Sequence, residues 1–105
     1  MSLTINKSFN EDKNIWDVSL KGEVDIYTAN KLKETLIDMV AERPQDILID
    51  ASRLEYIDST GLGVLIGALK RLKQHEKDIY IKDVKLNVKK IFKITGLDKI
   101  FKVEG

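Results

Sequence analysis

The hydrophobic pattern of this chain changes between that of a strand and that of a helix. The order of these changes constrains the fold more than any other sequence feature. Residues 46–51, "DILIDA", contain a continuous apolar triplet, which is typical of a strand buried on both faces. Apolar residues recur at helical spacing in the segments before and after it, residues 29–40 and 59–78. Strands that alternate with helices are joined by crossovers and lie parallel. The pattern therefore predicts an α/β domain.

The first quarter of the chain predicts two strands instead. Residues 3–9 form an edge strand in this interpretation, and Trp16, Val18 and Leu20 alternate with polar residues in the next strand, residues 15–22. The polar segment "NEDKN" between them favours a turn, so we expect an antiparallel hairpin at the N-terminus.

The other segments complete the predicted order. We expect a connection over residues 22–27, Thr28 as the cap of a helix that ends before Pro44, and a loop over residues 52–58. A strand (79–81), a helix stopped by Gly96 (86–96) and a last strand (99–103) follow. The prediction is one domain, residues 1–105, with a mixed sheet of about five strands and helices packed on the sheet.

Composition excludes several functions. Eighteen basic and seventeen acidic residues give a net charge of +1, which argues against nucleic acid as the main partner. The chain has no cysteine and one histidine, so disulfides, thiol catalysis and a multi-histidine metal centre are excluded. Because no apolar run approaches about 20 residues and the start turns polar early, we expect neither a membrane span nor a signal peptide, and a cytoplasmic location.

Polar chemistry is concentrated in "YIDSTGLG", residues 56–63, between a predicted strand and a predicted helix. The simplest interpretation is a helix cap, because Asp58, Ser59 and Thr60 are all good N-cap residues. A hydrolase is excluded by geometry: the only candidate base, His75, is 16 residues further along the same helix, about 24 Å away. The segment also lacks the endings of phosphate-binding loops, so we expect no catalytic residue and no cofactor.

A third interpretation is that Ser59 accepts a phosphate. A helix N-terminus accommodates added negative charge, and Gly61 and Gly63 would let another protein come close. A phosphate adds about −1.5 to −2 charges next to Asp58 and could repel a partner's carboxylate. The residues permit such a switch without requiring it.

Three segments resemble the STAS domain of bacterial anti-sigma factor antagonists: "GEVDIYTANKLKETL", "ILIDASRLEYIDSTGLGVLIG" and "FKITGLDKIFKV". The resemblance implies that Ser59 is the serine that family kinases phosphorylate, flanked by Asp58 and Thr60. It implies that Asp25 lies near this serine, although a turn residue before a helix is an equal alternative. Gly61 and Gly63 would serve both helix packing and partner approach.

Tyr56 is a candidate for the partner surface, whereas Leu54 and Ile57 are expected in the core. The implied function is partner switching by a protein that is not an enzyme. The unphosphorylated form, a monomer when free, would bind an anti-sigma factor that is also a serine kinase, and a serine phosphatase would reset the phosphorylated form. Two alternatives remain open, a constitutive STAS scaffold without phosphorylation and a nucleotide-binding module.

Overall fold

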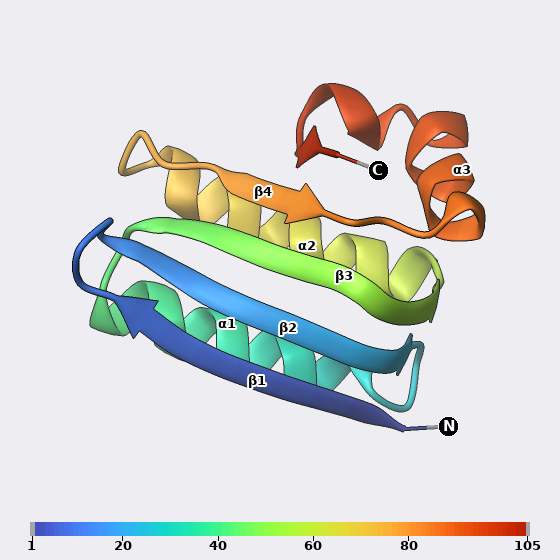
Figure 1. Cartoon of the computed structure of the whole chain (residues 1–105), viewed down its shortest axis with the longest axis horizontal. Helices are drawn as coiled ribbons and strands as arrows, with labels where there is room; N and C mark the ends of the chain where they lie inside the picture. The colour runs from blue at the N-terminus through green and yellow to red at the C-terminus, as the bar shows by residue number, and fades with distance from the viewer. Residues whose placement is uncertain (1, 105) are drawn as a thin grey trace.

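The fold is built on one sheet of five strands, as the computed structural model of residues 2–104 describes it. The strands lie in the order in which they occur in the chain, and the first is antiparallel to the second while the others are parallel (Figure 1). This arrangement confirms the predicted mixed sheet with an N-terminal hairpin. The strands are β1 (Leu3–Asn10), β2 (Ile15–Val24), β3 (Asp46–Ile57), β4 (Ile79–Lys82) and β5 (Lys102–Val103).

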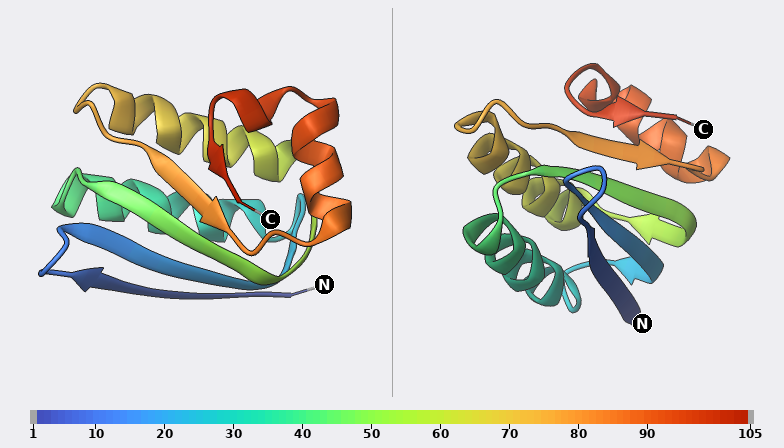
Figure 2. Two further views of the ribbon diagram at one scale, coloured as in Figure 1. Left: turned by 45° about the horizontal axis from the view of Figure 1, so that its top comes forward. Right: turned by 60° about the vertical axis from the view of Figure 1, so that its left-hand side comes forward.

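Two helices, α1 (Ala29–Glu42) and α2 (Ser59–Lys73), lie side by side on one face of the sheet (Figures 1 and 2). Their buried residues follow the predicted helical spacing, with Leu32 and Leu36 in α1 and Leu65 and Leu72 in α2 almost completely buried. A third helix, α3 (Leu86–Ile94), lies beyond β4 and contacts β3. Burial of these apolar faces against the sheet is the main source of stability.

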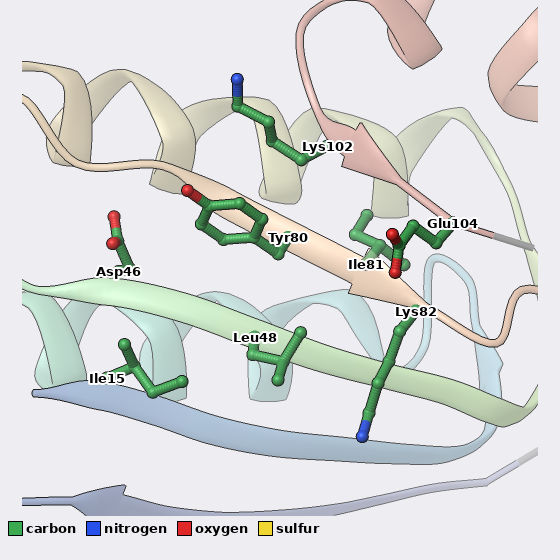
Figure 3. A pocket seen from close by; sticks show the side chains of 8 residues that line it. All are labelled: Ile15, Asp46, Leu48, Tyr80, Ile81, Lys82, Lys102 and Glu104. Atoms are coloured by element: carbon green, nitrogen blue, oxygen red, sulfur yellow. The ribbon is translucent and has the colours of Figure 1, made fainter. Parts of the chain in front are cut away.

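The apolar triplet of β3 is buried on one face only, which corrects the prediction from the sequence. Ile47 and Ile49 are buried beneath the helices, but Leu48 is half-buried on the other face, which neither α1 nor α2 covers. Ile15 and Tyr80 flank Leu48 there and line a hollow of about 520 Å³ (Figure 3). An apolar residue occupies position 48 on this open face because the neighbouring apolar side chains partly cover it. The apolar run is therefore uninterrupted although the strand is buried on one face only.

The predicted loop over residues 52–58 is also wrong, because β3 continues as a strand to Ile57. In the second half of β3 the buried residues are Ala51, Leu54 and Ile57, which are three positions apart rather than two. Register shifts against β2 between residues 19 and 23 account for this spacing, since a bulge changes which face a side chain meets. Strand β2 likewise runs on to Val24, into the predicted connection, because it stays paired with β3 up to Ile57.

The end of α2 and the length of the last strand differ from the prediction. Helix α2 stops at Lys73 instead of residue 78, because Glu76 takes a positive φ of 59° and the Lys77 N–H donates to the Leu72 carbonyl at 3.0 Å. Gly96, at φ 74°, ends α3 as predicted. A 3₁₀ turn, Leu97–Lys99, then shortens the last strand to two residues.

Candidate functional site

The carboxyl ends of β2 and β3 meet at one edge of the sheet. Val24 and Ile57 are register partners, and the Asp58 N–H donates to the Val24 carbonyl at 3.1 Å. Helices α1 and α2 therefore begin beside each other, and Asp25 and Asp58 are the first residues after the two strands (Figure 1). Ligands of open α/β sheets bind beyond this edge.

Asp58 is the residue that caps α2. Its backbone is extended, and its carboxylate accepts the Gly61 N–H at 3.0 Å. The sequence left Asp58, Ser59 and Thr60 as alternatives, and the structure selects the first. The Ser59 side chain is exposed, and within residues 2–104 its hydroxyl forms no hydrogen bond. The phosphoacceptor candidate is therefore accessible and is not required to hold the helix start.

The two glycines of the motif have different surroundings. A Cβ on Gly61 would lie 2.5 Å from Cγ1 of Val24 and 2.7 Å from Cγ1 of Ile57, so this glycine lets α2 pack directly on the strand ends. A Cβ on Gly63 would meet no atom within 4 Å. Packing therefore explains Gly61, whereas Gly63 leaves the backbone of α2 open.

A groove of about 320 Å³ separates α1 from α2 and begins at Thr60. Gly63 and Gly67 line it along α2, and Lys33 and Arg71 add positive charge on its two sides. The groove thus adjoins the residue that follows Ser59. Its apolar and cationic lining suits contact with another protein better than catalysis.

The start of α1 is held by a reciprocal pair of hydrogen bonds. The Asp25 carboxylate accepts the N–H groups of Tyr27 (2.9 Å) and Thr28 (3.1 Å), while the Thr28 hydroxyl accepts the Asp25 N–H (3.0 Å) and donates to the Glu23 carbonyl (2.8 Å). The two bonds between Asp25 and Thr28 have the pattern of a capping box, but they lie in the turn that precedes the helix. The predicted cap, Thr28, makes no cap bond to the helix. Its hydroxyl is taken by the turn instead, and Asp25 has the role of a turn residue.

Exposed hydrophobic side chains surround this edge. Ile26 and Tyr27 follow Asp25 and are 65% and 81% exposed, and Tyr56 at the end of β3 is 45% exposed. The sequence identified Tyr56 but not the other two, although an apolar pair inside a predicted turn was a usable signal. Leu54 and Ile57 are buried, as expected. These three exposed side chains lie in the segments where β2 and β3 end, Ile26 and Tyr27 after β2 and Tyr56 at the end of β3, and are named the edge patch below.

His75 lies beyond the last turn of α2, at the far end from Ser59, and is exposed. Across residues 2–104 the structure contains no group of three or more acidic or histidine side chains that could hold a metal ion. No helix in the same range is long and apolar enough to cross a membrane. The chemistry available at this edge is therefore a free hydroxyl, a capped helix start and an exposed apolar surface.

The sequence matches the STAS domain family over residues 6–105. The chain belongs to this family, among the anti-sigma factor antagonists. It is 37% identical over 103 residues to the anti-sigma-B factor antagonist of Staphylococcus epidermidis, and 38% identical to that of Staphylococcus aureus. Both alignments cover 98% of this chain and 94% of the relative.

Solved structures of STAS domain proteins have the same fold. An anti-sigma factor antagonist from Mycobacterium paratuberculosis superimposes with a TM-score of 0.82 at 28% identity, covering 98% of this chain and 86% of that one. SpoIIAA in its unphosphorylated form gives a TM-score of 0.71 at 15% identity, covering 92% of this chain and 97% of that one. The predicted fold and family are therefore confirmed. These relatives are regulators rather than known enzymes.

Proposed function

We propose that this chain is an anti-sigma factor antagonist that binds an anti-sigma factor with serine kinase activity, and that phosphorylation of Ser59 ends this binding. The names of its relatives, which match nearly the whole chain at 37–38% identity, support the antagonist role. In this role the chain acts in the cytoplasm as a monomer without enzymatic activity, and a serine phosphatase restores the unphosphorylated form.

The proposed switch rests on one observation: Asp58 caps α2, whereas the side chain of the neighbouring Ser59 is exposed. Because Asp58 caps α2, modification of Ser59 removes no hydrogen bond from the helix start. The free N–H groups and dipole at this end of α2 tolerate added negative charge. A phosphate on Ser59 thus changes the surface of the protein and leaves its fold in place.

The edge patch supports a binding surface around the phosphoacceptor. Tyr27 and Ile26 precede α1, Tyr56 precedes the motif, and all three project into solvent at the sheet edge where α2 starts. Aromatic side chains of this kind dominate the energetics of protein interfaces. Gly63, which leaves the α2 backbone open, extends the surface into the groove between the helices.

Electrostatic repulsion accounts for release. A phosphate carries about −1.5 to −2 charges, and next to the Asp58 carboxylate it concentrates negative charge at one point of the interface. Two unit charges 4 Å apart repel by about 4 kcal/mol at an effective dielectric of 20, equivalent to several hundred-fold in affinity. Asp25 adds a further acid at the same edge, and we expect its charge to affect kinase recognition.

The test combines phosphorylation with titration. The chain is incubated with radiolabelled ATP and the anti-sigma kinase, and binding of each form is measured by isothermal titration calorimetry. Wild type should take up label and then bind weakly, whereas Ser59→Ala should take up none and bind tightly. Ser59→Asp should lie between them, because one charge is less than a phosphate carries. Ser8→Ala, which removes an exposed hydroxyl from β1 at the other end of the sheet, is the matched control and should behave as wild type.

A constitutive scaffold is the alternative that this experiment separates. A scaffold would bind with equal affinity before and after treatment with kinase. Label on Ser59→Ala would show that another residue accepts the phosphate. Titration with ATP and GTP alone tests the nucleotide-binding alternative, for which residues 2–104 offer no phosphate loop.

A further inference from the structure

Positive charge is concentrated at the C-terminal end of the chain. Residues 82–102 contain seven lysines and two aspartates, a formal charge of +5 in a chain whose net charge is +1. The rest of the chain is therefore net acidic. Helix α3 supplies Lys89, Lys90 and Lys93 and contains no acidic residue. The basic residues are therefore concentrated in one segment, although the whole chain is close to neutral.

Helix α3 also has an outer side on which two large aliphatic side chains are exposed. Val88 and Phe92 are buried on its inner side, where the Phe92 ring meets Phe101 edge to face at 5.8 Å. The residues on the outer side, by helical spacing, are Leu86, Lys90, Lys93 and Ile94, named the α3 outer face. Leu86 is 79% exposed and Ile94 is 83% exposed, the highest value among the large hydrophobic residues of 2–104. Both side chains thus face solvent on the same side of the helix, one at each end of it.

The lysines of this face are available for a partner. Within residues 2–104, the carboxylates form ion pairs with Arg43, Lys73 and Lys85, and none with Lys90 or Lys93. The helix itself is held in place at its start, where Lys85 pairs with Glu55 at 3.3 Å and the Asn87 amide donates to the Glu55 carbonyl at 2.8 Å. The face therefore belongs to a helix that is attached to β3 at its start, and it presents two lysines that have no carboxylate partner within residues 2–104.

We infer that the α3 outer face binds an acidic, amphipathic helix of a partner protein. Leu86 and Ile94 are eight residues apart, about 12 Å along the axis, which matches the i and i+7 or i+8 anchors by which helices pack into one another. Lys90 and Lys93 lie between them and complement carboxylates that flank an apolar stripe. This interaction goes beyond the proposed function, because it requires neither kinase nor phosphate.

A membrane surface is the less suitable occupant. Helices that lie in a membrane interface bury a broad apolar face in the headgroup region. Helix α3 has nine residues, and its outer face offers two aliphatic side chains. A partner helix, in contrast, can cover both side chains and pair with both lysines at once.

Photo-crosslinking tests the inference. The full chain, carrying a photoreactive leucine analogue at position 86, is expressed in its host cells and irradiated, and the crosslinked peptide is identified by mass spectrometry. The expected product joins position 86 to a peptide that is acidic and carries aliphatic residues at helical spacing. Lys90→Glu combined with Lys93→Glu should reduce its yield at least tenfold. The control, Lys13→Glu combined with Lys21→Glu, changes two exposed lysines elsewhere and should leave the yield unchanged.

Purified components then give the decisive comparison. The Kd for the identified partner should rise at least tenfold in the Lys90→Glu, Lys93→Glu protein, and replacement of the partner's contacting carboxylates by lysines should restore binding. Circular dichroism confirms that each variant is folded. Lipid adducts, binding to vesicles with 30% anionic lipid, a basic contact peptide, equal loss in the control variant or the absence of any crosslink would each overturn the inference.

Discussion

Helices α1 and α2 start at the same edge of the sheet, and each start contains an aspartate followed by a hydroxyl residue. The two hydroxyl groups differ in their surroundings: that of Thr28 is buried, and that of Ser59 is exposed. Each start has an aspartate, Asp25 or Asp58, whose carboxylate accepts a backbone N–H three residues further on, and a hydroxyl residue close behind it. At α1 the Thr28 hydroxyl is buried and bonded to two backbone groups. At α2 the Ser59 hydroxyl is exposed, and the aspartate alone holds the turn. Accessibility, not residue type, therefore distinguishes the phosphoacceptor candidate from a structural hydroxyl.

Phosphorylation should distinguish the start of α2 from the start of α1 by the largest effect on binding. We expect kinase and ATP to modify Ser59 alone and to weaken binding to the anti-sigma factor by on the order of several hundred-fold, because of charge repulsion. Mass spectrometry locates the phosphate, and calorimetry measures the Kd before and after. A phosphate on Thr28 would break the comparison, since that hydroxyl would then be accessible.

The glycines of α2 test how tightly its start is packed. Gly61→Ala should lower the free energy of unfolding by about 2 kcal/mol, because the added methyl group collides with Val24 and Ile57. The matched variant, Gly63→Ala, should raise it by up to about 1 kcal/mol, since its Cβ enters open space and alanine favours the helix. Urea denaturation measures both. Equal effects would mean that α2 does not sit directly on the strand ends.

Removal of the buried hydroxyl tests the start of α1. Thr28→Val keeps the shape of the side chain but leaves the Asp25 N–H without its acceptor and the Glu23 carbonyl without its donor. We expect a loss of about 1.5 kcal/mol in the free energy of unfolding. Thermal unfolding with Ser59→Ala as the comparison measures the contrast, and a Ser59→Ala protein as destabilised as Thr28→Val would contradict it.

Thr60→Val should have the smallest effect. Its side chain is exposed and Asp58 already caps the helix, so we expect a change of less than about 0.5 kcal/mol. Circular dichroism during thermal unfolding checks this. A loss of cooperative unfolding would show that this hydroxyl holds the motif together.

Much of the fold was predictable because burial on one face leaves a periodic signal. The helical spacing in α1 and α2, the alternation of Trp16, Val18 and Leu20, and the glycine that ends α3 are local features, and each was interpreted correctly. The prediction failed in the second half of β3, where irregular pairing with β2 changes the spacing of the buried residues. Leu54 and Ile57 belong to a strand whose register against β2 is irregular, so their spacing resembled a loop.

The sequence by itself determined the set of candidates at the site, and the tertiary structure decided between them. Three polar residues in a row, 58–60, are all compatible with a cap, and Asp25 and Thr28 are both compatible with the start of α1. Only the pairing of Val24 with Ile57 brings the two helix starts together. The hydrogen bonds that distinguish the two starts are local, because Asp58 accepts the Gly61 N–H and Thr28 accepts the Asp25 N–H, each three residues away. Burial is a property of neighbours in space, and Val24 and Ile57, which pair where the two helices start, are more than thirty residues apart in the chain.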